Sequence, residues 1–208
     1  MSEHYFSESP GGELKTREIE VVLAGRPRRV LTAGGVFSPE HLDGGTAVLL
    51  RALEREQWPL EGRGSERPAI LDLGCGWGPI ALSAALHHPE AEVWAVDVNE
   101  RARELTARNA TRLNVANLRT AAPGDVPAEL RFAAIHSNPP IRVGKAALHE
   151  MLRLWLPRLT PGGEAHLVVA KHLGAESLQR WLAAEFPEFE VSRVAREKGF
   201  HVVRAVRV

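Results

Sequence analysis

Short apolar runs alternate with longer stretches of helical spacing from about residue 69 onward. The apolar runs predict strands over residues 69–73, 92–98, 118–121, 132–137 and 164–170. The stretches between them predict helices over 79–87, 100–113, 144–156 and 175–186, the first with a proline near its start. Strands that alternate with helices predict an α/β fold, a mostly parallel sheet with helices on both faces.

The two ends of the chain have a different pattern. Strands are predicted over 18–23 and 28–32, around a turn at 24–27, after a loosely held lead-in over 1–16. A helix over 42–58, a loop over 59–68, a turn at 160–163 and a closing hairpin of 189–195 with 201–208 complete the prediction. We therefore expect one compact domain, with an N-terminal β extension over 1–34 and the main domain over 35–208.

Composition places the chain among soluble globular proteins. It has 208 residues, of which 44% are apolar and 25% are charged. Its single cysteine, Cys75, excludes an intramolecular disulfide. The first residues are polar and no apolar run is long enough for a membrane span, so we expect no signal peptide, no membrane association and a cytoplasmic location.

The charge balance limits the kinds of partner. The 26 basic residues equal the 26 acidic residues, which argues against a whole-surface electrostatic grip on nucleic acid but leaves room for a local patch. The four arginines at positions 101, 103, 108 and 112 are interpreted as surface charge rather than an RNA track. Histidines without ligand spacing and the lack of a cysteine cluster predict no metal site.

A glycine-rich segment follows the strand predicted at 69–73 and precedes a helix. It reads Asp72-Leu73-Gly74-Cys75-Gly76-Trp77-Gly78. A dinucleotide fold uses Gly-x-Gly-x-x-Gly with the pyrophosphate at the helix N-terminus, whereas here the third glycine comes one residue early. Together with the acidic Asp72, this spacing favours an uncharged nucleoside that bears an amino-acid tail and disfavours a nicotinamide dehydrogenase. Asp72 or a loop carbonyl is the predicted acceptor for the amino group of that tail.

Three polar residues after the next two strands complete a predicted nucleoside site. Asp97 ends the second strand about 20 residues after the glycine loop, where a carboxylate accepts both ribose hydroxyls. Asn99 is placed to assist, and Asp125 is a candidate acceptor for the adenine amine. The alternative for Asp97 is a cap on the helix that starts near Glu100.

Asn138-Pro139-Pro140 follows the strand predicted at 132–137. An amine on an aromatic ring is a poor nucleophile, because its lone pair is delocalised into the ring. The Asn138 side-chain oxygen and the Pro139 carbonyl can bind its two hydrogens and hold the nitrogen toward a methyl donor. The two segments together predict methyl transfer from S-adenosylmethionine (SAM) to a planar amine. Arg142 and Lys145 come next, either as contacts to phosphates or as a solvated helix start.

The chain resembles class I SAM-dependent methyltransferases with the Asn-Pro-Pro motif, and more closely the ribosomal-RNA guanine-N2 methyltransferases of the small methyltransferase domain group. The resemblance rests on the glycine loop, the Asn-Pro-Pro motif and five other segments: 4–6, 35–38, 42–46, 97–99 and 198–200, with Lys171. It implies a Rossmann-like seven-stranded sheet whose last strand is antiparallel. It also implies cofactor contacts from Phe37, Thr46, Asp72, Gly74, Cys75, Gly76, Gly78, Asp97, Val98, Asn99, Asp125 and Asn138.

The resemblance further implies how the substrate is held. The residue after the second proline is usually aromatic and stacks on the target base, but here it is Ile141. Ile141, Arg142, Lys145 and Lys171 are the predicted substrate contacts, and RNA, ribosomal by the resemblance, is the predicted partner of a monomer or homodimer. Two alternatives stay open: methylation of adenine or of a protein glutamine amide, and a SAM- or RNA-binding module without turnover.

Overall fold

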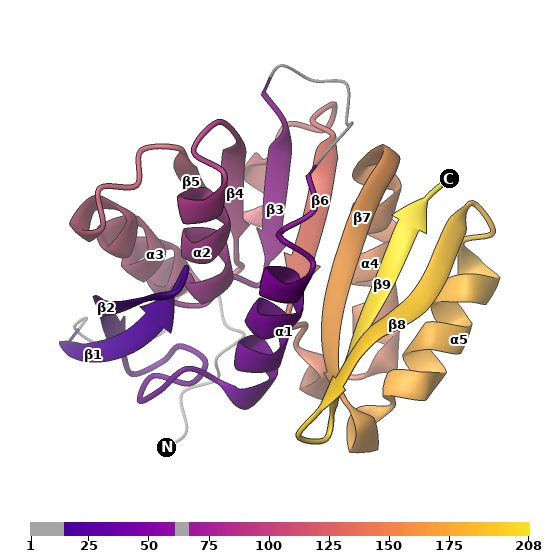
Figure 1. Ribbon diagram of the computed structural model, residues 1–208, viewed down its shortest axis with the longest axis horizontal. Coiled ribbons are helices and arrows are strands. Elements are labelled where there is room, and N and C mark those ends of the chain that lie inside the picture. Colours follow the sequence, from indigo (N-terminus) through magenta and orange to yellow (C-terminus); the bar gives the residue numbers. More distant parts are fainter. Residues whose placement is uncertain (1–14, 61–66) are drawn as a thin grey trace. The chain divides into compact units, whose positions relative to one another are not determined.

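The computed structural model describes residues 15–60 and 67–208 (Figure 1). The His4-Tyr5-Phe6 segment of the resemblance and residues 61–66 of the predicted loop lie outside this range. The chain divides into two compact units. Unit 1 comprises Met1–Asp43 and Leu71–Ala128, and unit 2 comprises Gly44–Ile70 and Glu129–Val208.

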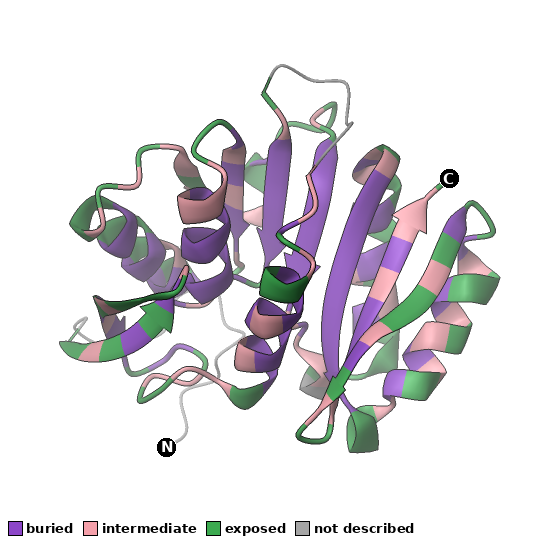
Figure 2. Cartoon of the chain, viewed as in Figure 1, coloured by how far each residue is buried: buried purple, intermediate pink, exposed green. Residues whose placement is uncertain are grey.

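The fold is the predicted α/β class. The main sheet has seven strands in the order β5-β4-β3-β6-β7-β9-β8, and β1 and β2 form a separate two-stranded sheet. The last strand, β9, runs antiparallel to both of its neighbours, as the family resemblance implied. Strands β3 and β6 are buried along their whole length (Figure 2), which explains why they are continuous apolar runs in the sequence.

Unit 1 carries the predicted strand–helix alternation. Its elements are β1 (Thr16–Leu23), β2 (Arg26–Ala33), β3 (Ala69–Leu73, which begins in unit 2), α2 (Pro79–His87), β4 (Glu92–Val96), α3 (Glu100–Arg112), β5 (Leu118–Ala121) and the short η1 (Pro123–Asp125). Strands β4 and β5 pair in parallel, with Val93 opposite Leu118. These bounds agree with the predicted elements within two residues, because each apolar run is short and has clear turn residues at its ends.

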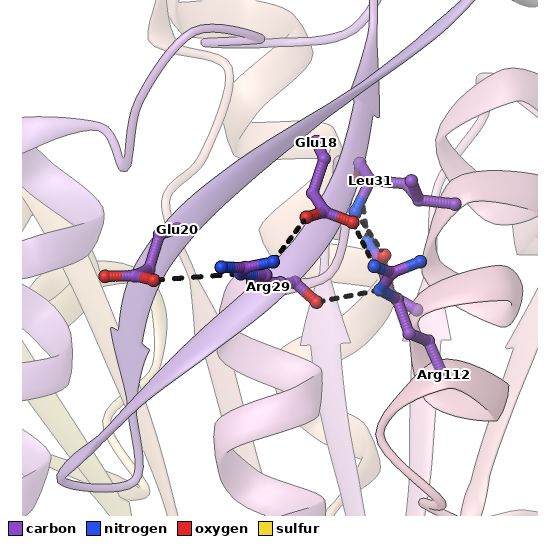
Figure 3. Close-up of polar contacts among 6 residues, drawn as sticks. Glu18, Glu20, Arg29, Leu31 and Arg112 are labelled. Atoms are coloured by element: carbon purple, nitrogen blue, oxygen red, sulfur yellow. Dashed lines mark hydrogen bonds and ion pairs between the residues drawn. The ribbon is translucent and has the colours of Figure 1, made fainter.

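The β1–β2 hairpin is attached to α3 by polar contacts (Figure 3). Arg29 forms ion pairs with Glu18 and Glu20, and Arg112 of α3 pairs with Glu18 and donates to the Arg29 carbonyl. These side chains are largely exposed, so the pairs add little to stability. The buried Asn109 adds more: its side chain accepts from the Leu31 N–H and donates to the Leu31 carbonyl.

Unit 2 contains the other half of the sheet and three helices. Its elements are α1 (Gly44–Arg55), β6 (Phe132–Ser137), η2 (Ile141–Val143), α4 (Lys145–Trp155), η3 (Leu156–Arg158), β7 (Leu159–Ala170), η4 (Lys171–Leu173), α5 (Ala175–Glu185), β8 (Phe189–Glu197) and β9 (Phe200–Arg207). Helix α1 packs on β7 and β9, and α5 packs on β8 and β9. In the part of the chain that the structure describes, no helix combines the length and apolar character that a membrane span requires.

The turn predicted at 160–163 takes an unexpected form. It lies inside β7, where the register jumps from Phe132 opposite Leu159 to Ala134 opposite Glu164. Four residues of β7 therefore bulge out opposite a single residue of β6. Gly163 is needed there, because a Cβ would lie 2.8 Å from the Thr160 carbonyl oxygen. The turn residues bend the strand without ending it.

Polar side chains also lie in the interior of unit 2. The ring of His166 is fully buried, and its Nε2 lies 3.0 Å from Glu56 Oε2 at the end of α1. Glu164 accepts two hydrogen bonds of 2.8 Å from the Arg204 guanidinium. Bidentate pairing is the geometry that a buried carboxylate needs to offset its lost hydration.

We expect Asn109→Ala to destabilise the protein far more than Arg112→Ala. Asn109 makes three hydrogen bonds, two with Leu31 and one to the Trp77 carbonyl, and its loss leaves backbone groups unpaired at a cost of roughly 3 kcal/mol. Arg112→Ala removes exposed contacts worth about 1 kcal/mol or less. Urea unfolding of both variants measures the difference, and equal losses would contradict the stated role of Asn109.

Candidate active site

The glycine loop of unit 1 runs from the end of β3 into α2. Gly74, Gly76 and Gly78 have φ values of 80°, 58° and 94°, all in the left-handed region that favours glycine. A Cβ on Gly74 or Gly76 would meet no atom within 4 Å, so the backbone borders open space at these two positions. The space leaves room for the close approach of a ligand, and the predicted contact with a cofactor stays a prediction.

The third glycine, Gly78, is required for a different reason: a side chain at this position would collide with α3. A Cβ on Gly78 would lie 2.8 Å from Thr106 Oγ1, and that hydroxyl also donates to the Gly76 carbonyl at 3.0 Å. Thr106 and Asn109 of α3 therefore shape the loop from behind. Sequence reasoning did not identify either residue, because their helical positions do not distinguish them from ordinary core residues.

Asp97 ties the glycine loop to the end of β4. Its Oδ2 accepts from the Gly76 N–H and its Oδ1 from the Asn99 N–H, both at 2.9 Å. Burial is the main reason that the pKa of Asp97 is raised, and the bonds from Asn99 and Gly76 partly oppose it. Each carboxylate oxygen keeps acceptor capacity for a further donor, so the predicted contact with two ribose hydroxyls is chemically open.

Asp97 does not cap α3, which was the alternative interpretation of this residue; the cap is Asn99. Asn99 is the N-cap of α3, and its side chain accepts from the Arg101 N–H at 3.0 Å. The same side chain donates to the Gly35 carbonyl at 2.7 Å. Asp97 is thus not needed as the cap, and Asn99 holds the 34–38 segment. Its predicted contact with ribose stays a prediction.

One expectation about the arginines of α3 was wrong. Arg101 is buried rather than a surface charge, and its guanidinium donates to the Gly34 carbonyl at 2.7 Å. Trp77 of the glycine loop donates to the Ser38 carbonyl at 3.2 Å. The 34–38 segment is therefore held at both ends, and its Phe37 side chain, 49% exposed, remains available to contact a ligand. The three other arginines are half-buried or exposed.

Asp72 is the most unusual ionisable group of unit 1. It is 1% exposed, its Oδ2 accepts from the Ala81 N–H at 2.9 Å, and its Oδ1 has no hydrogen-bond partner among the described residues. Burial and the nearby Asp97 raise the pKa of Asp72 to about 8. A buried carboxyl oxygen without a partner next to a glycine loop fits a ligand with a cationic amino group.

The remaining predicted cofactor residues of unit 1 lie close to this loop or after β5. Val98 is exposed beside Asp97, and Asp125 is exposed in η1. Cys75 is buried, and burial raises the pKa of its thiol well above the ordinary value. The thiol therefore stays protonated, which argues against a role as a nucleophile. Contacts of these residues with a cofactor stay predictions.

Asn138 lies in unit 2, directly after β6. Its side-chain Nδ2 donates to Thr46 Oγ1 of α1 at 3.0 Å. Thr46 is buried, whereas Asn138 is half-buried. Because the Nδ2 side of the amide is bonded to the helix, the Oδ1 side is directed away from Thr46. Thr46 therefore supports the Asn-Pro-Pro motif in this structure, and the cofactor contact that the resemblance implied for it stays a prediction.

The residues after Asn138 form a tight turn. The Pro139 carbonyl accepts from the Ile141 N–H at 2.8 Å, which uses one of its two lone pairs. Ile141 is half-buried in η2, and Lys145 and Lys171 are exposed. The Arg142 side chain lies outside what the structure describes. Within the described residues, no cluster of three or more histidine, cysteine or acidic side chains could hold a metal ion.

We expect the stability of the protein to fall as pH rises, and Asp72 to cause much of this fall. The pKa of Asp72 is about 8 in the folded state, above its ordinary value of 3.8, so its contribution is full below about pH 4 and lost by about pH 8. Asp72→Asn should flatten the decline in the free energy of unfolding between these limits. Urea unfolding at several pH values measures it, with the exposed Asp125→Asn as control; parallel curves for wild type and Asp72→Asn would refute the assignment.

Comparison with known proteins identifies the family of the chain. The family model "Methyltransferase small domain" matches residues 27–204. An uncharacterized protein of Bacillus subtilis, YbxB, is 34% identical over 211 residues and is covered completely, as is this chain. A ribosomal RNA large subunit methyltransferase G of Streptomyces avermitilis is 34% identical over 192 residues, which cover 89% of this chain and 46% of that protein.

A solved structure extends the likeness to three dimensions. The T. thermophilus 16S rRNA guanine-N2 methyltransferase RsmC, in complex with AdoMet and guanosine, has a TM-score of 0.78 and 25% identity. The match covers 96% of this chain and 52% of that protein, so the chain spans about half the length of these two rRNA methyltransferases. The match over 27–204 and the fold built around the glycine loop place this chain in the methyltransferase small domain family, as a SAM-dependent methyltransferase.

Proposed function

We propose that this protein transfers the methyl group of SAM to the exocyclic N2 of guanine in ribosomal RNA. The observation that carries the proposal is Asn138, whose amide is oriented by Thr46 at the carboxyl end of β6. The names of the two rRNA methyltransferases and their likeness over most of this chain support the RNA substrate. The name of RsmC, a 16S rRNA N2 G1207 methyltransferase, supports the guanine target.

Unit 1 supplies the residues that would hold the cofactor. Asp97 would accept from the ribose hydroxyls, and the partnerless Oδ1 of Asp72 would accept from the amino group of the methionine tail. The open side of Gly74 and Gly76 would allow the tail to lie against the backbone. Phe37 and Asp125 would contact the adenine ring and its amine. When bound, SAM supplies a sulfonium-activated methyl group as the electrophile.

Asn138 would activate the acceptor amine without taking a full charge. Its Oδ1 accepts one amine hydrogen, and the second lone pair of the Pro139 carbonyl accepts the other. Both bonds draw the nitrogen lone pair out of conjugation and hold it in place, so orientation and fixed dipoles lower the barrier. The proton that leaves the nitrogen after transfer passes to solvent, because amide and carbonyl oxygens are too weakly basic to keep it.

Ile141 supports a second candidate for the methyl acceptor, a protein glutamine amide. A branched aliphatic side chain gives apolar contact to a base but no ring to stack on it. An amide with little π surface, such as a protein glutamine side chain, loses less from that replacement than a purine does. Separate incubations of the protein with labelled SAM and ribosomal RNA, DNA or a glutamine-containing release-factor-like protein decide between the acceptors, and label in RNA guanine N2 is the expected result.

We expect Asn138→Ala to bind SAM normally and to transfer its methyl group about a hundredfold more slowly, or worse. Loss of one preorganised dipole of this kind costs roughly 3 kcal/mol of transition-state stabilisation. Calorimetric SAM binding and transfer of labelled methyl to ribosomal RNA give the two readouts. Normal transfer by this variant would remove Asn138 from the mechanism.

Substitution of Thr46 tests the orientation of the Asn138 amide. Thr46→Val keeps the shape but loses the bond to Nδ2, so the amide is held less firmly and kcat should fall about tenfold, as expected for one hydrogen bond. Thr46→Ser keeps the hydroxyl and should retain most of kcat. An unchanged SAM affinity with reduced kcat supports orientation, whereas a lost SAM affinity would mean that Thr46 serves the cofactor instead.

A further inference from the structure

Four exposed cations gather in unit 2 around the turn between β8 and β9. Lys171 begins η4 directly after β7, Arg193 and Arg196 lie on β8, and Lys198 lies in the turn itself. The backbone joins these segments, because the Lys171 N–H donates to the Gly199 carbonyl at 2.8 Å. In Figure 1 the β8–β9 turn and the end of β7 lie side by side at the lower edge of this unit. We call these four residues the basic surface.

The register of β8 brings its two arginines to one face. Arg196 lies opposite His201 and Arg193 opposite Val203, and His201 and Val203 are two residues apart on β9. Arg193 and Arg196 are three apart, which would place them on opposite faces of a regular strand. The register shift between Arg193 and Ala195 cancels this difference and turns both guanidinium groups to the same side.

The buried His201 locates the charges. It is 1% exposed, and neither of its ring nitrogens has a hydrogen-bond partner among the described residues. Burial is the main reason that its pKa is lowered; Arg193, Arg196 and Lys171 lower it further, and Glu176 of α5 raises it. Three cations and one carboxylate therefore lie within electrostatic reach of His201, which gives its surroundings a net positive charge. The N-terminus of α5, capped by Gly174 without a side-chain bond, adds to that sign.

The carboxylates nearby do not neutralise these cations. Glu197, between Arg196 and Lys198, pairs instead with Arg51 and Arg55 of α1. Across residues 15–60 and 67–208, none of the four cations forms an ion pair with a carboxylate. Exposed cations held together without counter-charges in a chain of zero net charge are suited to a polyanion.

The basic surface lies at the same end of unit 2 as Asn138. Strands β6 and β7 pair in parallel, so Asn138 after β6 and Lys171 after β7 lie at the same end of the sheet, and Lys171 is bonded to the β8–β9 turn. A strand of nucleic acid with its target base at Asn138 could therefore reach these cations with the phosphates of neighbouring nucleotides.

We propose that Lys171, Arg193, Arg196 and Lys198 bind the phosphate backbone of the substrate RNA beside the target nucleotide. The proposal rests on the proposed function, since it takes RNA as the substrate. It adds three cations that neither the sequence pattern nor the comparisons assign to substrate binding. It also explains how a chain without net positive charge holds RNA, because its binding charge is local.

The test is the double variant Arg193→Gln/Arg196→Gln, with binding of a short fluorescent single-stranded RNA measured across a salt series. Each phosphate contact in a single strand contributes about 0.7 to the slope of log K against log salt. Loss of two contacts should lower the slope by about 1.4 and weaken binding about 25-fold near 0.1 M salt. The matched control is Arg108→Gln/Arg119→Gln, which removes two exposed arginines of unit 1 and should leave both quantities unchanged.

The outcomes separate this proposal from the proposed function. Weaker binding and a lower slope in the Arg193/Arg196 variant alone support the basic surface, whether or not the RNA is methylated. Wild-type affinity and slope in that variant overturn the surface, even if guanine N2 is methylated. Equal losses in the variant and the control also overturn it, because they indicate a general effect of charge. Thermal unfolding and SAM affinity, both expected to be unchanged, verify that the variants are folded.

Discussion

The carboxylate of Asp97 determines the shape of the predicted nucleoside site. It binds the N–H of Gly76 and that of Asn99, and so connects the loop after β3 to the start of α3. From that start, Asn99 and Arg101 hold the backbone of residues 34 and 35. One half-buried ionisable group therefore positions three segments that are far apart in the sequence, and it still has lone pairs for a further donor.

The surroundings of Asp72 and Asp97 disfavour the charged form of each carboxylate. Burial raises the pKa of both, and the negative charge of Asp97 raises the pKa of Asp72 further, in a medium that screens charge poorly. A cationic amino group or a pair of hydroxyls would relieve this cost. Perturbed pKa values of this kind are common where a protein gives up stability to preorganise a functional site, which fits the predicted role of these two residues.

Helix α1 has a comparable role in unit 2. Its first turn contacts Asn138 through Thr46 and lies against Phe200, and its last turns bind Glu197 and His166 through Arg51, Arg55 and Glu56. One rigid helix contacts both the Asn-Pro-Pro segment and the start of β9, next to the β8–β9 turn. Asn138 and the basic surface therefore keep a fixed position relative to each other within this unit. The proposed methyl transfer additionally requires a methyl donor at the same nitrogen.

The sequence alone determined the element order and the fold class, and it indicated the two segments to which the chemistry is assigned. Apolar runs bounded by turn residues define strands locally, and glycines before a helix have few other uses. Only the tertiary structure decided which residue caps α3, that Arg101 is buried, and that Thr106, Asn109 and Thr46 support the site. It also decided that residues 160–163 bulge within β7 and that a register shift aligns Arg193 with Arg196. These features depend on partners tens of residues away, and hydrogen bonds over such separations leave no periodic trace in a single chain.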